Sequence, residues 1–169
     1  MLILLVLFSR EDNCWKVTDF GTASRATSSR QNTTHLSRGT ASYRSPEILD
    51  SRRPKYNNKT DIFALGCIAY EILTGEKLFW DDYAILRYST TGTLGSEIWW
   101  PEAKNGDLNT ILASLERVVA SMLETDHRRR PSARHIGASL WNIRAGIGSG
   151  QVPTPDGPPI QVRQSFGLY

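Results

Sequence analysis

The stretch "NNKTDIFALGCIAYEILTGE", residues 57–76, decides the fold because its composition suits a helix that is buried on nearly every side. Asn and Thr stand at its entrance and Gly75 stands at its exit, with a mostly apolar body between them. Polar residues of this kind cap helix starts, and glycine commonly ends a helix. A helix that is apolar all round belongs in the middle of a core. The stretch therefore predicts a central helix over residues 60–74.

The chain after this helix predicts more helices. Residues 81–105 mix aromatic residues with glycine, which indicates one short helix and a loop. "RRRPSARHIGASLWNIR" places Pro131 near the first turn of a last helix. Between these two regions, residues 107–126 carry apolar residues at helical spacing: Leu108, Ile111, Leu112, Leu115, Val118, Val119, Met122 and Leu123. We expect a mainly α domain with four or five helices.

The front of the chain predicts strands. "MLILLVLF" is too short to span a bilayer, and it has neither the basic lead-in nor the cleavage site of a secretion signal. A charged turn, residues 10–12, separates it from "CWKVTDF". This pattern indicates two short buried strands joined as a β-hairpin. Without a secretion signal, we interpret the glycosylation sequons at Asn32 and Asn58 as chance matches, and we expect no membrane association.

Composition narrows the class of protein further. The formal net charge is +3, and Lys and Arg are spread along the 169 residues, so we expect no nucleic-acid partner. Cys14 and Cys67 lie far apart with no CxxC spacing and no histidine in a ligand pattern. They are predicted to be free buried thiols in a reducing compartment, not a zinc site or a disulfide framework.

Two segments have no apolar periodicity. Residues 22–39 are rich in Ser and Thr and contain no acidic residue, which predicts a long exposed loop. Residues 146–169 are rich in Gly and Pro and are predicted to be a disordered tail, with a polyproline ligand as the alternative reading. The sequence thus predicts one folded domain, residues 1–145, followed by this tail.

Five local signals, in this order, resemble the large lobe of a eukaryotic-type protein kinase. Asp19-Phe20-Gly21 matches the family's DFG triplet. "GTASYRSPE" (39–47) is similar to the GTxxYxAPE segment, and "DIFALG" (61–66) to the DxWxxG helix. "TGEKLF" (74–79) and "RRRPSA" (128–133) resemble the elements that follow. The resemblance implies a kinase-like C-lobe with a short β-hairpin at its N-terminus and an activation segment over residues 19–47.

The same resemblance implies roles for the DFG triplet. Asp19 would hold Mg²⁺, because a hard cation prefers carboxylate oxygen, and the ion would bridge the phosphates of ATP. Phe20 would pack as a hydrophobic peg, and Gly21 would allow a backbone turn. Taken alone, the triplet could equally be a turn after a strand, with the Asp as a cap.

Structural roles follow for three other residues. Glu47 and Arg130 would form a buried ion pair that joins the activation segment to the later helices, with Arg128 and Arg129 as rivals for Arg130. The alternative is a solvated basic cluster. Asp61 would anchor the catalytic loop from within the central helix, or it would remain near the surface as a helix-entry residue.

The segment before Glu47 resembles the substrate-facing loop of Ser/Thr kinases. Thr40 and Tyr43 would belong to this substrate loop, with a plain turn as the alternative. Upstream, Thr33, Thr34 and Ser37 are candidate phosphorylation sites, because a phosphate there could pair with arginines and order the loop. Four arginines lie nearby: Arg25, Arg30, Arg38 and Arg44.

By resemblance, the function is ATP-dependent phosphoryl transfer to Ser or Thr of protein substrates, in the cytoplasm or nucleus. The family's Gly-rich loop, small-lobe Lys and H-R-D-x-x-x-x-N catalytic loop do not occur among the residues before Asp19. We therefore expect weak or no ATP binding and no catalysis by this chain alone. Three hypotheses remain: a fragment of an active kinase, a non-catalytic, pseudokinase-like docking or regulatory module for protein substrates or another kinase, and a nonfunctional remnant.

Overall fold

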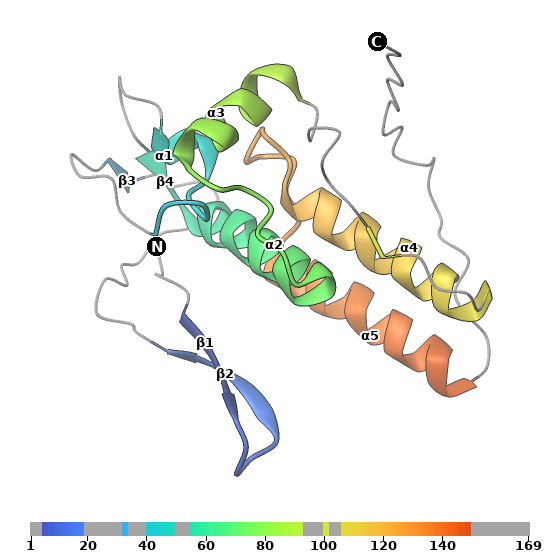
Figure 1. Cartoon of the computed structure of the whole chain (residues 1–169). Coiled ribbons are helices and arrows are strands. Elements are labelled where there is room, and N and C mark those ends of the chain that lie inside the picture. Colours follow the sequence, from blue (N-terminus) through green and yellow to red (C-terminus); the bar gives the residue numbers. More distant parts are fainter. Residues whose placement is uncertain are drawn as a thin grey trace.

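The computed structural model describes residues 5–18, 32–33, 40–49, 55–92, 100–101 and 106–149. This part of the chain is mainly helical, as predicted, and contains five helices (Figure 1). The elements are β1 Leu5–Ser9, β2 Cys14–Thr18, β3 Asn32–Thr33, α1 Pro46–Leu49, β4 Lys55–Tyr56, α2 Asn58–Thr74, α3 Asp82–Thr91, α4 Gly106–Met122 and α5 Ala133–Ser149. The predicted disordered tail lies almost entirely outside the described residues, except that its first residues, 146–149, continue α5.

Helix α2 is the central helix that the sequence predicts, and its ends follow from local capping. Asn57 Oδ1 accepts a hydrogen bond from the Lys59 backbone N–H at 2.8 Å, and the Asn57 N–H donates to Thr60 Oγ1 at 3.3 Å. This reciprocal capping box starts the helix two residues earlier than predicted. At the other end Gly75 has φ 78°, a left-handed conformation that glycine adopts at low cost.

Helix α2 is buried along one face, and not on nearly every side as its apolar sequence predicts: its buried side chains are neighbours at helical spacing, whereas Ile72 is 59% exposed. Most of this face packs into a core cluster formed by Phe63, Cys67, Tyr70, Phe79, Ile85, Tyr88, Val119 and Leu123. Ile62, at the edge of the same face, belongs to a second cluster with Met122 of α4 and Ile136 of α5. The Phe63 and Phe79 rings stack with their centroids 6.0 Å apart. Burying a large apolar side chain contributes about 1.5 to 3 kcal/mol, so these contacts stabilise the whole lobe.

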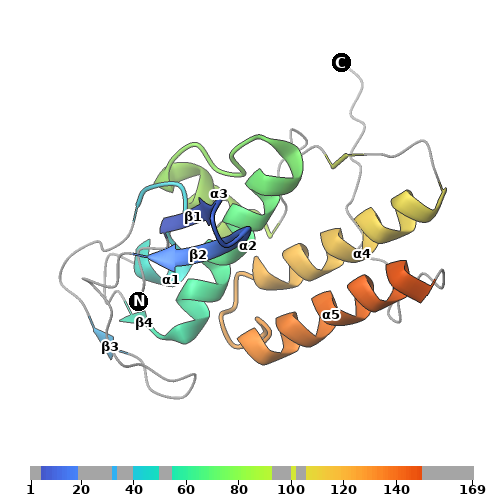
Figure 2. The same ribbon diagram turned by 90° about the horizontal axis from the view of Figure 1, so that it is seen from below.

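The remaining helices pack around α2. Helices α4 and α5 lie side by side and run in opposite directions, with α4 also against α2 (Figure 2). Helix α3 packs against α1 at the other end of the lobe. It starts at Asp81, whose Oδ1 accepts from the Ala84 N–H at 2.8 Å, and it ends before Gly92. This is the short helix that was predicted within residues 81–105. No helix in the described ranges is long and apolar enough to cross a membrane.

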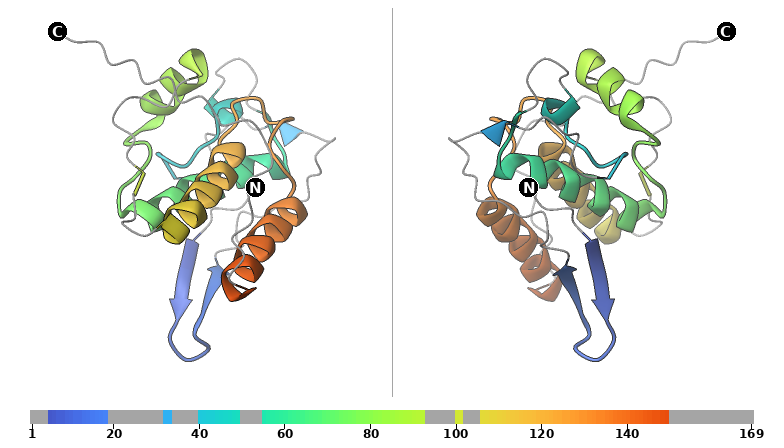
Figure 3. Two further views of the ribbon diagram at one scale, coloured as in Figure 1. Left: turned by 90° about the vertical axis from the view of Figure 1, so that its right-hand side faces the viewer. Right: turned by 90° about the vertical axis from the view of Figure 1, so that its left-hand side faces the viewer.

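The predicted hairpin is present, and side chains next to its turn are exposed. Strands β1 and β2 pair antiparallel, with Phe8 opposite Trp15, and the hairpin projects away from the helices (Figures 1 and 3). Phe8 is 45% exposed. Cys14 is exposed, so the prediction of a buried thiol is wrong there, whereas Cys67 is buried and both thiols are free. An apolar strand is buried only where another element covers it, and the end of this hairpin extends beyond the helices.

The predicted exposed loop, residues 22–39, is not irregular throughout. Residues 32–33 form β3, which pairs antiparallel with β4 so that Asn32 lies opposite Tyr56 and Thr33 opposite Lys55. The pairing joins the loop to the entrance of α2. The rest of the predicted loop lies outside the described residues.

Gly66 sets the distance between α2 and α4. A Cβ added at Gly66 would lie 3.1 Å from both Leu123 Cδ2 and Met122 Cβ. Such contacts are shorter than ordinary carbon contacts, so Met122 and Leu123 would have to shift by a few tenths of an ångström. At Gly137, in α5, there is room for a side chain, because an added Cβ would have no atom within 4 Å.

We predict that Gly66→Ala lowers the free energy of unfolding by about 1 kcal/mol, because overpacking costs about 1 to 3 kcal/mol and the gain in helix propensity only partly offsets it. Gly137→Ala is the matched control and should raise stability by up to about 1 kcal/mol. Urea unfolding followed by circular dichroism measures both. Equal stabilisation by the two alanines would refute the close approach at Gly66.

Candidate functional site

The described part of the candidate site is built on an ion pair between Glu47 and Arg130. Glu47 lies in the first turn of α1, and Arg130 lies in the turn between α4 and α5. Arg130 Nη1 donates to Glu47 Oε1 at 2.7 Å and Nη2 donates to Oε2 at 2.8 Å. The exposed fractions of the two side chains are 0% for Arg130 and 14% for Glu47. The geometry is the bidentate fork that a planar guanidinium and a carboxylate form best.

The other donors of Arg130 are also satisfied. Its Nε donates to the Glu124 carbonyl at 2.7 Å, Nη1 to the Lys59 carbonyl at 3.0 Å, and Nη2 to the Thr125 carbonyl at 3.3 Å. With the two bonds to Glu47, these account for all N–H donors of a guanidinium. Its central carbon lies 4.9 Å from the centroid of the Phe63 ring. One buried side chain therefore connects α1, α2 and the turn that follows α4.

The charge of Arg130 favours the ionised form of Glu47 and opposes that of Lys59. Burial alone would raise the pKa of Glu47, but the hydrogen bonds and the charge of Arg130 hold the pKa below its usual value. Thr60 Oγ1 also donates to Glu47 Oε1 at 3.1 Å. Lys59 Nζ donates to the Arg130 carbonyl at 2.5 Å, and burial together with the Arg130 charge lowers the pKa of Lys59. Glu47 is thus stabilised as a carboxylate at neutral pH.

The structure distinguishes among the three consecutive arginines. Arg128 is 80% exposed and pairs with Asp126 at 3.1 Å, and Arg129 is exposed. Arg130 alone of the three contacts Glu47 in the described part of the chain. The turn after α4 directs Arg128 and Arg129 toward solvent and Arg130 toward the interior. Three identical residues in a row do not show which of them will be buried.

In the predicted substrate loop, Thr40 is exposed to solvent, whereas Tyr43 is held against α2. Thr40 is exposed, and its carbonyl accepts from the Tyr43 N–H at 3.2 Å. Tyr43 is half-buried, and its hydroxyl donates to Glu71 Oε2 of α2 at 2.5 Å. Burial, with the adjacent Glu71 carboxylate, raises the pKa of Tyr43 to about 12. Lys77 Nζ lies 5.8 Å from the centre of the Tyr43 ring.

Two anchors of this loop were missed by sequence reasoning. Ser42 is buried with φ 76°, and its hydroxyl donates to the Trp80 carbonyl at 2.8 Å. Arg44 Nη1 contacts Asp82 Oδ2 of α3 at 2.5 Å. Each partner is 38 residues away, so no local sequence signal could have identified these contacts. Residues 40–47 are consequently held by α2, α3 and the turn after α4.

For the other predicted site residues the structure gives a position in the fold or no description. Asp61 is half-buried in the first turn of α2, and the Thr33 backbone lies in β3. The predictions for Asp19, Phe20, Gly21, Thr34 and Ser37 fall outside the described residues. The roles of all these residues therefore remain predictions.

A magnesium site needs several oxygen ligands close together. In the described ranges no group of three or more His, Cys, Asp or Glu residues could hold a metal. The described residues supply no complete metal site.

We predict that Arg130→Met lowers the free energy of unfolding by about 3 to 5 kcal/mol, because it leaves a buried carboxylate without its partner. Arg128→Met is the matched control and should cost at most about 1 kcal/mol, since Arg128 pairs on the surface. Urea unfolding measures both variants. If Arg130→Met prevents folding, Glu47→Gln with Arg130→Met should restore folding in part, and a double variant no better than the single one would contradict the pairing.

The lowered pKa of Glu47 predicts a dependence of stability on pH. A carboxyl whose folded pKa is below its unfolded value of about 4.3 stabilises the fold above that pH, and loses this contribution as pH falls through the folded pKa. The stability difference between the wild type and Glu47→Gln should therefore shrink from pH 6 to pH 3. Glu76→Gln, at an exposed carboxyl, is the control. A difference that stays constant over this range would contradict the pKa shift.

Comparison with known proteins agrees with the motifs and the fold. The family model for the protein kinase domain matches residues 5–142. The chain is 39% identical over 153 residues to the serine/threonine-protein kinase PknB of Mycolicibacterium smegmatis, covering 89% of this chain and 22% of that protein. It is 30% identical over 141 residues to the wall-associated receptor kinase-like 10 of Arabidopsis thaliana, covering 77% of this chain and 18% of that relative.

A third relative is the serine/threonine-protein kinase chk-2 of Caenorhabditis elegans, 27% identical over 126 residues, with 75% of this chain and 25% of the relative covered. The chain thus spans a quarter or less of the length of these three relatives. The matched region runs from β1 into α5, and it contains the Glu47–Arg130 pair and the predicted substrate loop. The chain belongs to the protein kinase domain family, as a helical C-lobe of the eukaryotic Ser/Thr type.

Proposed function

We propose that this chain is the substrate-facing part of a protein Ser/Thr kinase, which transfers the terminal phosphoryl group of ATP to Ser or Thr of a protein substrate. The observation that carries the proposal is the Glu47–Arg130 pair, which fixes the predicted activation segment to the helical lobe. Exposed Thr40 and anchored Tyr43 are consistent with a surface that receives a polypeptide. Phosphoryl transfer depends mostly on positioning and charge stabilisation, so a fixed substrate loop suits it.

The remaining roles rest on the family resemblance. Asp19 would hold Mg²⁺, which would neutralise charge on the phosphates of ATP, with Phe20 and Gly21 shaping the backbone around it. Asp61 would anchor the catalytic loop from the first turn of α2. Thr40 would lie near the reacting hydroxyl of the substrate. As part of this proposal, we place the protein in the cytoplasm or the nucleus.

Phosphorylation at Thr33, Thr34 or Ser37 would regulate the same segment. Thr33 lies in β3, and the residue paired with it in β4 is Lys55, which is cationic. A phosphate carries nearly two negative charges, so a modified residue near this pairing would attract Lys and Arg side chains. The effect would be to order residues on the N-terminal side of the substrate loop.

The chain as given should not catalyse transfer by itself. It contains no H-R-D-x-x-x-x-N pattern, and its histidines, His35, His127 and His135, all follow Asp19. The base that accepts the substrate proton, and the lysine that contacts the phosphates, must therefore come from residues other than these. Binding of Mg²⁺ and ATP by these 169 residues should be weak or absent.

A second candidate is a non-catalytic docking or regulatory module, for protein substrates or another kinase. Exposed aromatic side chains favour it: Trp80 and Tyr83, at the start of α3, are 74% and 72% exposed. Tyr and Trp are enriched in protein interfaces because they contribute large contact area with a polar end. Such a role requires neither Asp19 nor ATP.

The experiment that separates these candidates starts with the full-length transcript. If an in-frame Gly-rich loop, Lys and H-R-D-x-x-x-x-N motif precede Met1, the longer product should transfer phosphate from ATP to dephosphorylated casein. Asp19→Asn should then reduce the rate by about a hundredfold or more, because loss of a metal ligand removes several kcal/mol of charge stabilisation. Asp107→Asn, at an exposed position on α4, is the control.

Two results would contradict the kinase proposal. One is a transcript whose reading frame contains none of these motifs, which would favour the docking module. The other is a longer product whose activity is unaffected by Asp19→Asn, which would show that this residue does not hold the catalytic metal.

A further inference from the structure

A pocket lies between α2 and α4, outside the network of residues 40–47. Its volume is about 420 Å³, within the range of about 300 to 1,000 Å³ that is usual for ligand pockets. It is lined by Leu73, Trp100, Pro101, Asn109, Leu112, Ala113 and Glu116. Neither the proposed kinase chemistry nor the comparisons assign a role to it.

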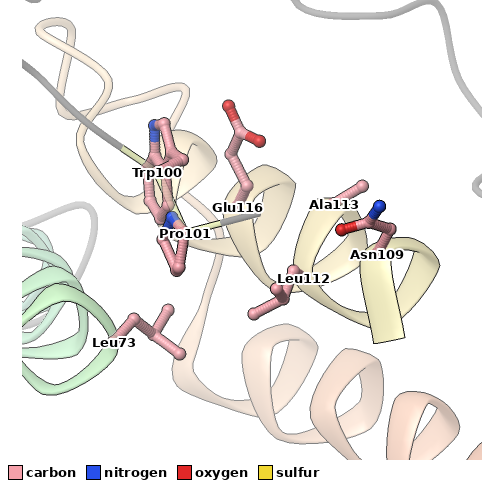
Figure 4. Close-up of a pocket in the computed structure, with 7 residues that line it drawn as sticks. All are labelled: Leu73, Trp100, Pro101, Asn109, Leu112, Ala113 and Glu116. Atoms are coloured by element: carbon pink, nitrogen blue, oxygen red, sulfur yellow. The ribbon is translucent and has the colours of Figure 1, made fainter. Parts of the chain in front are cut away.

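The apolar part of the pocket is held by the core. Figure 4 shows the Leu73 side chain of α2 and the Leu112 side chain of α4 pointing into the space between the two helices. Trp100 packs edge-on against the Tyr70 ring, with the centroids 5.2 Å apart, and Tyr70 belongs to the main core cluster. The Trp100 ring is therefore fixed in position and is a preformed wall of the pocket.

The lining also contains two polar side chains, Asn109 and Glu116, of which only Glu116 is ionisable. Glu116 is half-buried on α4, and burial raises its pKa, an effect that the charge of Arg117 only partly opposes. Within the part of the chain that the structure describes, its carboxylate makes no hydrogen bond or ion pair. A partly desolvated carboxylate would gain from an incoming cation that forms hydrogen bonds with it.

The combination of a carboxylate and an aromatic ring favours one type of cation. A guanidinium can make two parallel hydrogen bonds to a carboxylate and can also stack on an aromatic face, whereas an ammonium behaves as a compact point charge. The same molecule already holds a guanidinium in this way, since Arg130 pairs with Glu47 and lies over Phe63. Leu73 and Leu112 would accept apolar atoms beside the guanidinium.

We propose that this pocket, formed by Leu73, Trp100, Leu112 and Glu116, docks an arginine side chain with an apolar neighbour, presented by a peptide segment of a partner protein. The Glu116 carboxylate would accept the guanidinium hydrogen bonds, and the Trp100 ring would support its face. The peptide's apolar residue would contact Leu73 and Leu112. The docking is independent of phosphoryl transfer, so its failure would leave the proposed kinase function untouched.

The test is a titration of the 169-residue chain with the capped tripeptide Leu-Arg-Leu, followed by calorimetry and by the NMR signal of the Trp100 indole. We expect saturable binding that shifts this signal. Replacing the arginine by citrulline, a neutral side chain of the same shape, should weaken binding at least about tenfold, or about 1.4 kcal/mol, because the charge that strengthens the hydrogen bonds to Glu116 is lost. Glu116→Gln should weaken binding to a similar extent.

Glu76→Gln is the matched control, because Glu76 is an exposed carboxylate outside the pocket, and its Kd should equal that of the wild type. Equal binding of the arginine and citrulline peptides, or of the wild type and Glu116→Gln, would overturn the proposal. Absence of binding at millimolar peptide would overturn it too. Binding that appears only after residues 150–169 are removed would mean that the chain's own C-terminal segment, and not a partner, occupies the pocket.

Discussion

The rest of the structure depends on one buried cation, the guanidinium of Arg130. A charge inside a protein is tolerated only when a counter-charge and enough hydrogen-bond acceptors surround it. Here the counter-charge comes from Glu47, and the acceptors come from the backbone at Lys59, Glu124 and Thr125. Four separate places in the chain must meet at one point, or the charge is left unsatisfied. The pair therefore acts more as a constraint on geometry than as a source of net stability.

The ion pair is in direct contact with the apolar core. Arg130 lies over the Phe63 ring, and Phe63 stacks on Phe79, so the polar network and the main core cluster share a wall. Helix α2 supplies that wall, and the absence of a side chain at Gly66 allows α4 to approach it closely. The turn after α4, which carries Arg130, is positioned by the same packing. A change that separates α2 from α4 would therefore move the ion pair as well as the core.

The sequence predicted those features that have a local cause. The apolar body of α2 and its capping residues identified the central helix, and the turn between two apolar runs identified the hairpin. Pairing of Glu47 with an arginine came from motif resemblance, but three adjacent arginines are equivalent until the turn is folded. Exposure of Cys14, and the contacts of Ser42 and Arg44 with residues 80 and 82, depend on which elements meet in space. The alternation of apolar and polar residues, and the composition of a segment, carry no information about these tertiary contacts.

The anchors of residues 40–47 bear on what this lobe can do. Four residues anchor this segment through hydrogen bonds or ion pairs with other described residues: Ser42, Tyr43, Arg44 and Glu47. None of these contacts requires a nucleotide or a metal. The described contacts alone thus hold the predicted substrate loop in a fixed form. Preorganisation of this kind lowers the entropic cost both of binding a polypeptide and of aligning it for transfer. The kinase and docking hypotheses both need a rigid lobe, and they differ in whether the chemistry proposed for Asp19 is completed by residues outside the described lobe.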